Sequence, residues 1–316
     1  MPLSQVTVKA PATSANLGPG FDVFGLALQK PSDTVALTLI PEGIKIEVTG
    51  LAAETISKTP EKNTAGVVAD QMLKEFSLKT GVRIGIERGI LPGMGLGSSA
   101  ASAAAVAYGL NHIFNLKLNN NELIRLAAKG EVTSAGSEHA DNVSAAICGN
   151  FIIVNSYNPP SIVNLKAPRN MDVCVAFPNI ATPASKTQTA RSVIPKLVPI
   201  DKLVHNVGKA AAMASAFATG DVDLIGKSML DAIVEPARAS LIPNYQRVRE
   251  NAVRAGACGV AISGAGPAMI AIVNKKKANA SRVASAMREG FESAGLNATA
   301  FATRPGKGVC LVEIEK

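Results

Sequence analysis

Residues 92–102 read Pro92-Gly93-Met94-Gly95-Leu96-Gly97-Ser98-Ser99-Ala100-Ala101-Ser102. This stretch lies between an alternating segment, 82–88, that predicts a strand and an alanine-rich run, 98–114, that predicts a helix. Three glycines at alternate positions leave no Cβ to obstruct close approach of the backbone. Ser98 and Ser99 open the helix, where unpaired N–H groups and the positive end of the dipole gather. The stretch therefore predicts an anion site whose natural ligand is polyphosphate.

Two familiar phosphate motifs do not fit this stretch. A P-loop requires Gly-Lys-Ser/Thr, and no lysine follows these glycines. A dinucleotide fingerprint requires Gly-x-Gly-x-x-Gly and an acidic residue about 20 positions later, whereas the spacing here is Gly-x-Gly-x-Gly and position 117 is lysine. A glycine-rich turn without a ligand stays open as the alternative.

Two other segments combine glycine with polar residues. Residues 263–267 read Ser-Gly-Ala-Gly-Pro between two apolar segments, and a plain hairpin turn explains them. Residues 9–22 read Lys-Ala-Pro-Ala-Thr-Ser-Ala-Asn-Leu-Gly-Pro-Gly-Phe-Asp. Their glycine and proline content predicts an irregular segment, and their Lys, Asn and Asp make it a candidate site loop.

The rest of the chain predicts mixed secondary structure. We expect strands at 34–40, 44–48, 82–88, 151–154, 171–177, 297–303 and 309–314, a strand–turn–strand at 259–273, and helices at 64–78 (capped by Asn63), 98–114, 121–130, 202–219, 222–233, 244–255 and 278–294. Strands and helices in segregated runs predict an α+β architecture in two domains. Pro159-Pro160 is the expected linker between them.

Composition excludes several classes of protein. With 47% apolar residues a large core is available, and disorder is excluded as the main state. The net charge of +8 is diffuse and fits small phosphorylated ligands better than nucleic acid; twelve Phe and Tyr and no Trp argue against single-strand binding. The long uncharged stretches are broken by Gly, Pro or Asn, so no membrane span is expected. Four scattered cysteines predict buried free thiols and a cytoplasmic location, and no signal peptide is expected.

The three glycine-containing segments together resemble the three motifs of the GHMP kinases, in order and at fitting separations. The opening Ala-Pro-Ala-Thr-Ser-Ala-Asn-Leu-Gly-Pro-Gly-Phe-Asp-Val-Phe-Gly, residues 10–25, is similar to that of the members that phosphorylate L-homoserine. Residues 130–131, 139–142 and 235–238 support the resemblance, which runs from about residue 6 to 314.

This resemblance implies a fold, a reaction and cofactors. The expected architecture is the two-domain GHMP kinase fold, with an ATP-binding domain like ribosomal protein S5 domain 2 at 1–158 and a ferredoxin-like substrate domain at 159–316. The expected reaction is phosphorylation of L-homoserine to O-phospho-L-homoserine by ATP with Mg²⁺, for threonine synthesis. The resemblance alone also suggests a homodimer.

Site residues follow from the same resemblance. The expected ATP-binding residues are Pro92, Gly93, Met94, Gly95, Leu96, Gly97, Ser98, Ser99, Ala100, Ala101, Ser102 and Asn63. Ser99 and Glu131 match the metal ligands. The expected substrate-binding residues are Asn16, Asp22, His139, Thr187, Arg191, Arg238 and Gly264. Asp141, Asn142 and Lys9 match positions near the reacting hydroxyl, with Asp141 and Lys9 placed like a base and its neighbour and Asn142 placed to orient the hydroxyl.

Three other functions stay open at this stage. A GHMP kinase for another small alcohol, such as a shikimate- or mevalonate-pathway intermediate, would share the ATP motif, although two arginines with Asp22 favour an amino acid. A catalytically inactive sensor of the same fold would bind ligand without turnover, and the presence of Ser99, Glu131 and Asp141 argues against it. RNA binding through an S5-like fold would require strong salt dependence.

Overall fold

The computed structural model describes residues 4–135, 140–181, 183 and 186–315. The first sheet has seven strands: β1 (Gln5–Asn16), β2 (Gly20–Ile40), β3 (Ile44–Gly50), β4 (Gly81–Arg88), β5 (Phe151–Tyr157), β6 (Pro160–Leu165) and β11 (Cys310–Glu315). Their order is β11-β1-β2-β4-β3, and β5 pairs with both β2 and β6. All pairs are antiparallel except β3 with β4.

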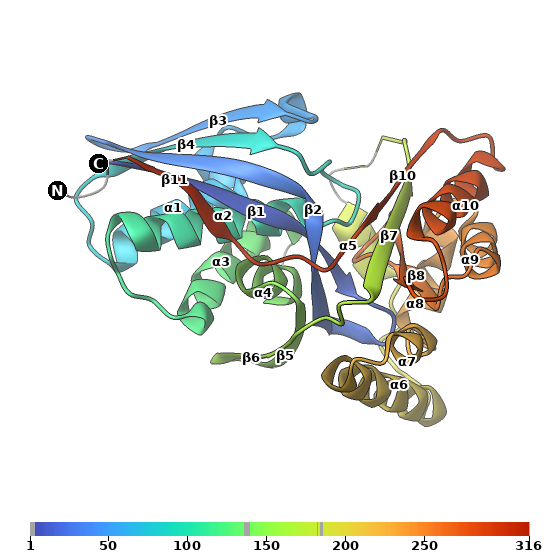
Figure 1. Cartoon of the computed structure of the whole chain (residues 1–316). Coiled ribbons are helices and arrows are strands. Elements are labelled where there is room, and N and C mark those ends of the chain that lie inside the picture. Colours follow the sequence, from blue (N-terminus) through green and yellow to red (C-terminus); the bar gives the residue numbers. More distant parts are fainter. Residues whose placement is uncertain (1–3, 136–139, 182, 184–185, 316) are drawn as a thin grey trace.

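Helices cover one face of this sheet (Figure 1). They are α1 (Thr64–Glu75), α2 (Ser98–Ile113), α3 (Asn120–Ala135) and α4 (Ala140–Cys148), with short 3₁₀ turns at Ala53–Thr55 and Pro60–Lys62. The alanines that crowd α2 are buried, because α2 packs against β1 and β2 and against the other three helices. Small side chains allow this close packing on every side of the helix.

The second sheet is smaller and fully antiparallel, with the order β10-β7-β9-β8. Its strands are β7 (Met171–Pro178), β8 (Gly259–Ile262), β9 (Met269–Asn274) and β10 (Ala298–Thr303). The helices of this half are α5 (Lys186–Ser192), α6 (Ile200–Thr219), α7 (Val222–Lys227), α8 (Val234–Arg238), α9 (Tyr245–Arg254) and α10 (Ala280–Glu292), with a 3₁₀ turn at Ala239–Leu241. Every residue of β9 is buried, since the sheet is covered on both faces.

Most predicted elements are confirmed, and the α+β architecture with them. The Asn63 cap is also confirmed, because its side chain accepts a hydrogen bond from the Ala65 N–H at 2.9 Å. The predicted helix at 222–233 is too long. It ends at Lys227, and the Asp231 carboxylate accepts the N–H groups of Ile233, Val234 and Glu235, which starts α8 as a separate helix.

The irregular segment expected at 9–22 is wrong. Residues up to Asn16 belong to β1, and only the turn before Gly20 is irregular. Pro11 is tolerated because the register with β2 shifts between Pro11 and Thr13, and because β11 pairs with β1 only as far as Lys9. Small residues in this strand let it pack closely against α2 and α4.

The linker expected at Pro159-Pro160 is also wrong. Asn158 and Pro159 form the turn of the β5–β6 hairpin, and Pro160, which pairs with Tyr157, is the first residue of an edge strand, a position that needs no ladder N–H. The first sheet therefore extends past residue 158 through β6, and β11 returns to it at the end of the chain. The crossover to the second sheet lies between β6 and β7.

Candidate active site

The phosphate loop, residues 92–97, connects β4 to α2. Gly93, Gly95 and Gly97 all have positive φ, at 78°, 85° and 64°. A Cβ on Gly97 would lie 1.9 Å from Thr13 Oγ1, and one on Gly95 would lie 2.3 Å from the Ser263 carbonyl oxygen. Glycine is therefore required here by the neighbouring segments, as well as by the left-handed backbone.

Those neighbours are the other two glycine-containing segments. Thr13 N–H donates to the Leu96 carbonyl at 3.0 Å, and Ser263 Oγ donates to the Gly95 carbonyl at 2.8 Å. Asn16 Nδ2 donates to the Gly264 carbonyl at 2.9 Å, which joins the first loop (residues 16–22) to the third loop (residues 263–267). The β8–β9 turn is thus a hairpin turn, as expected, and also the third wall of a junction of three loops.

A buried ion pair fixes the start of the phosphate loop. Arg88 Nη1 lies 3.1 Å from Asp33 Oδ2, and Asp33 Oδ1 accepts the N–H groups of Gly89 and Ile90 at 2.9 Å each. Arg88 also donates to the Ser98 carbonyl at 3.0 Å. Burial raises the pKa of Asp33, and Arg88 opposes that rise.

Sequence reasoning missed this pair. The sequence does contain a signal for it, because Arg88 stands at one of the alternate strand positions that face the interior. A charged residue at an inward-facing position requires a buried partner of opposite charge.

At the helix end of the loop, Ser99 and Glu131 provide two oxygen ligands. Ser99 Oγ donates to Glu131 Oε2 at 3.0 Å, and the Glu131 side chain, on α3, is buried. Hydroxyl and carboxylate oxygens are hard donors of the kind that Mg²⁺ selects, and Mg²⁺ usually takes its remaining ligands from substrate phosphates and water. Within the described residues no group of three or more His, Cys, Asp or Glu could hold a metal ion.

A pair of arginines faces the junction from the second half of the chain. Arg238, buried on α8, donates to the Gly264 and Ala190 carbonyls at 2.9 Å each. Arg191, on α5, lies 2.7 Å from Asp22 Oδ2. Both guanidinium groups lie over the Phe21 ring, at 5.4 Å for Arg191 and 5.1 Å for Arg238. The two guanidinium groups thus lie against the same aromatic ring, and that of Arg191 also pairs with the Asp22 carboxylate.

Asp141 and Asn142 lie at the start of α4 and reach the same junction. Thr13 Oγ1 donates to Asn142 Oδ1 at 2.7 Å, and the Asn142 N–H donates to Asp141 Oδ1 at 2.7 Å. Burial, together with the nearby Asp22 charge, raises the pKa of Asp141 to about 7, against the opposing Asn142 hydrogen bond and Arg191. These hydrogen bonds to Thr13 and Asp141 therefore fix the Asn142 side chain beside the phosphate loop.

Lys186, at the start of α5, was not identified from the sequence. Its ammonium donates to the Gly93 carbonyl at 2.8 Å and also contacts the Gly266 carbonyl. Burial, together with the nearby Arg238 charge, lowers the pKa of Lys186 to about 7. No sequence motif marks this lysine, because its contacts connect three segments that are distant along the chain.

The remaining predicted site residues lie in different parts of the structure. The Asn63 amide is used within the chain, since it caps α1 and donates to the Ser57 carbonyl at 2.6 Å. Lys9 is exposed, pairs with Thr34 and Cys310 in the sheet, and lies four residues upstream of Thr13, so the structure does not bring it to Asp141. Thr187 lies one turn before Arg191 on the same face of α5. His139 lies outside the described residues.

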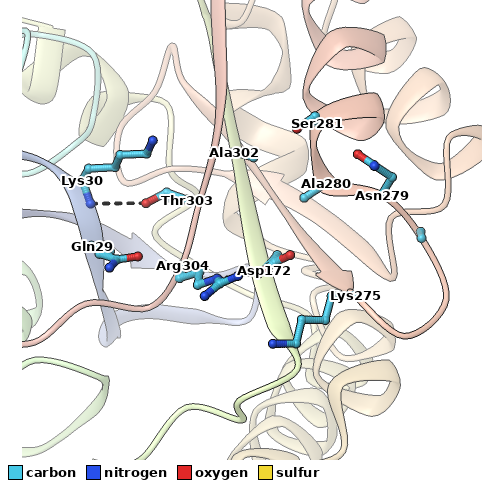
Figure 2. Close-up of a pocket in the computed structure, with 11 residues that line it drawn as sticks. Gln29, Lys30, Asp172, Lys275, Asn279, Ala280, Ser281, Ala302, Thr303 and Arg304 are labelled. Atoms are coloured by element: carbon cyan, nitrogen blue, oxygen red, sulfur yellow. Dashed lines mark hydrogen bonds and ion pairs between the residues drawn. The ribbon is translucent and has the colours of Figure 1, made fainter.

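The structure has a small cavity at the junction and a larger one away from it. A small cavity of about 10 Å³ is bordered by Asn16, Gly264, Arg238 and Glu235, at the arginine end of the junction. A larger cavity of about 420 Å³ lies between β2, β10 and the start of α10 (Figure 2). There the Lys30 N–H donates to Thr303 Oγ1 at 3.2 Å and Arg304 lies 3.1 Å from Asp172, and none of the predicted site residues lines it.

No helix among the described residues is both long and apolar enough to cross a bilayer.

Comparison with known proteins identifies the family. A model described as "GHMP kinases N terminal domain" matches residues 63–150, and one described as "GHMP kinases C terminal" matches residues 213–293. A homoserine kinase of Methanococcus vannielii is 45% identical over 315 residues, covering 99% of this chain and 100% of that protein.

Solved structures agree with this result. A homoserine kinase from Cytophaga hutchinsonii superposes with a TM-score of 0.90 at 33% identity, over 98% of each chain. A Lactococcus lactis galactokinase shares the fold, with a TM-score of 0.70 at 18% identity over 97% of this chain and 95% of that one. The chain belongs to the GHMP kinases and, within them, to the homoserine kinase family.

Proposed function

We propose that the chain transfers the γ-phosphoryl group of ATP to the side-chain hydroxyl of L-homoserine, giving O-phospho-L-homoserine and ADP. The observation that carries this proposal is the three-loop junction, where a glycine loop at a helix start lies opposite Arg191, Arg238 and Asp22. One end of the junction suits a polyphosphate, and the other suits a small zwitterion.

The phosphate end is provided by main-chain groups. The N–H groups of residues 95–99 lie at the start of α2, where the dipole favours an anion. The Arg88–Asp33 pair holds the loop before any ligand arrives, so little ordering is needed on binding. Ser99 and Glu131 would hold Mg²⁺, which would neutralise phosphate charge as it develops.

The substrate end matches both charges of an amino acid. Arginine binds a carboxylate through two parallel hydrogen bonds, and Arg191 and Arg238 both lie against the Phe21 ring. Asp22 is the matching carboxylate for an ammonium group. A bound zwitterion would take over the Asp22–Arg191 contact, with its ammonium on Asp22 and its carboxylate on the arginines.

The transfer itself requires positioning more than covalent chemistry. The hydroxyl oxygen forms a bond to the γ-phosphorus as the bond to the β–γ bridging oxygen breaks, and ADP leaves with the electron pair of that bond. The hydroxyl proton is lost to solvent as the phosphoryl group arrives. Asn142, held by Thr13 and Asp141, orients the hydroxyl. Because the transition state is loose, we assign Asp141 to positioning through Asn142 and not to proton abstraction.

The four cysteines of the chain are all free, as expected, but only Cys174 is buried; Cys148 and Cys258 are half-buried and Cys310 is exposed. Free thiols and an ATP-dependent reaction both fit the cytoplasm, which we propose as the location.

The test is ADP release with Mg-ATP and a panel of L-homoserine, mevalonate and shikimate. We expect turnover with L-homoserine alone. In Arg238→Leu, KM for L-homoserine should rise roughly 10- to 100-fold with KM for ATP unchanged, because a hydrogen bond to a charged group contributes about 1.5–3 kcal/mol. Arg282→Leu, an exposed arginine on α10, is the matched control.

Other outcomes would separate the alternatives. A preference for mevalonate or shikimate would mean that the chain is a GHMP kinase with a different substrate. ATP binding without turnover on any alcohol would indicate a sensor.

A further inference from the structure

Arg238 is the last residue of a helix that is too short to hold its own position. Helix α8 runs for five residues, Val234–Arg238, and Pro236 within it has no N–H to donate. Forming a single helical turn fixes several backbone dihedral angles in exchange for very few hydrogen bonds, so it is unfavourable on its own. Other parts of the chain must therefore hold α8 in place.

The Asp231 carboxylate holds the start of α8. Its Oδ1 accepts the N–H groups of Ile233 at 2.7 Å and Val234 at 3.1 Å, and its Oδ2 accepts the Glu235 N–H at 2.8 Å. Because the next residue is Pro236, every N–H at the start of this helix has a partner. A carboxylate in this position stabilises the helix and fixes its direction.

Asn206, on α6, holds Asp231 in turn. Its Nδ2 donates to Asp231 Oδ1 at 2.8 Å, and its Oδ1 accepts the Ala232 N–H at 2.9 Å. Asn206 is buried, whereas residues 201–205 of the same helix are exposed. A buried amide requires partners for both of its ends, and these two contacts supply them. Helix α6 thus fixes residues 231 and 232 just before α8 begins.

Arg238 lies one helical turn beyond the end that Asp231 holds. It is buried, and its Nε and Nη1 donate to the Ala190 and Gly264 carbonyls at 2.9 Å each. Hydrogen bonds of this length are lost when donor and acceptor move apart by about 1 Å. The position of α8 therefore decides where the guanidinium group stands.

We propose that Asp231, fixed by Asn206, is a positioning residue that places Arg238 for the carboxylate of L-homoserine. This inference rests on the proposed function, in which Arg238 binds that carboxylate. Asp231 acts from outside the binding site, because it borders the small cavity of about 10 Å³ beside Arg238, which is too small for an amino acid. Both of its carboxylate oxygens accept main-chain N–H groups, so they are not available to a substrate ammonium group.

Helix α8 has a second anchor, which should keep the chain folded when Asp231 is replaced. Glu235 is buried, its Oε2 accepts the Ile262 N–H at 3.3 Å, and the Tyr245 hydroxyl donates to its Oε1. These contacts hold α8 to β8 and α9. Loss of the Asp231 contacts should therefore displace α8 and Arg238 and leave the fold intact.

The test compares Asp231→Ala with Asp221→Ala in steady-state ADP release. Asp221 is the matched control, because its carboxylate caps α7 by accepting the Leu224 N–H at 3.0 Å, and α7 carries no substrate residue. In Asp231→Ala, KM for L-homoserine should rise roughly 10-fold and KM for ATP should stay within about twofold, since a misplacement of about 1 Å costs up to ~100-fold. In Asp221→Ala both KM values should match the wild type, although the melting temperature falls by a similar amount.

Two further variants separate positioning from a general loss of structure. Asp231→Asn keeps one acceptor oxygen, so its KM for L-homoserine should lie between those of the wild type and Asp231→Ala. In the Arg238→Leu background, Asp231→Ala should cause no further rise in that KM, because two residues that act through one contact are not additive. Full additivity, or an equal rise of KM for ATP and for L-homoserine, would overturn the proposal.

Crystal structures of Asp231→Ala and Asp221→Ala give a readout that does not depend on the substrate. The Arg238 guanidinium should leave the Ala190 and Gly264 carbonyls in Asp231→Ala and keep both contacts in Asp221→Ala. An Arg238 that stays in place in Asp231→Ala would overturn the positioning role. A wild type that does not turn over L-homoserine would instead overturn the proposed function.

Discussion

Asp141 illustrates how a single buried group couples function to stability. Its pKa is raised by burial to about 7, so the folded state disfavours the charged form. A raised carboxyl pKa gives stability that is complete below the unfolded value and is lost as pH rises through the folded value. The native protein should therefore lose stability between about pH 4 and pH 7.

The substitution Asp141→Asn tests this coupling. We expect the variant to be more stable than the wild type by about 2–4 kcal/mol at pH 8, with the difference shrinking toward pH 4. Turnover should fall at least tenfold, because the charged oxygen that holds Asn142 is replaced by a weaker, neutral amide acceptor. Urea unfolding across pH, together with ADP release, measures both effects. An equal stability difference at pH 4 and pH 8 would contradict the assignment.

Lys186 gives a prediction about protons taken up on binding. Its pKa is lowered to about 7 by burial, and its ammonium touches the Gly93 carbonyl of the phosphate loop. A bound triphosphate should restore its charge, so ATP binding at pH 8 should take up as much as about one proton. Calorimetry in buffers of different ionisation enthalpy measures that number.

The matched variants for this measurement are Lys186→Met and Lys196→Met. Lys196 is exposed, and its substitution should leave the proton uptake unchanged. Equal uptake in the wild type and in Lys186→Met would remove Lys186 from the phosphate site.

At the scale of elements, the phosphate loop depends on close contact with β1. Gly97→Ala should destabilise the fold by about 1–2 kcal/mol through its positive φ alone, and further through the 1.9 Å approach to Thr13 Oγ1. Gly43→Ala is the matched control, because Gly43 has φ 74° and open space around its Cβ. Only Gly97→Ala should also weaken ADP binding, measured by calorimetry. Equal loss of stability in both variants would mean that the Thr13 contact has no effect.

The elements themselves were largely predictable from local pattern. The strand before the phosphate loop, the loop and α2 follow from alternation, glycine spacing and a serine-opened helix. Where prediction failed, the cause was pairing between distant segments. Strand β1 keeps its conformation across Pro11 because β2 supplies the ladder, and the turn at Asn158 and Pro159 is held by the β5–β6 pairing.

At the scale of the whole molecule, the candidate site could be predicted only in part. The resemblance pointed to Arg191, Arg238 and Asp22, which the structure brings together over Phe21. Asn16 and Gly264 are 248 positions apart and are joined only by the fold. Lys186 and the Arg88–Asp33 pair escaped notice because their partners are set by burial and tertiary contact, which no single segment encodes.

The central claim is that one junction holds the phosphates at the start of α2 and the zwitterion on the arginines. The most direct measurement is a crystal structure of the chain with a non-hydrolysable ATP analogue, Mg²⁺ and L-homoserine. We expect phosphate oxygens on the N–H groups of residues 95–99, and the amino-acid carboxylate on Arg191 and Arg238. Phosphates bound elsewhere, or a homoserine that contacts neither arginine, would contradict it.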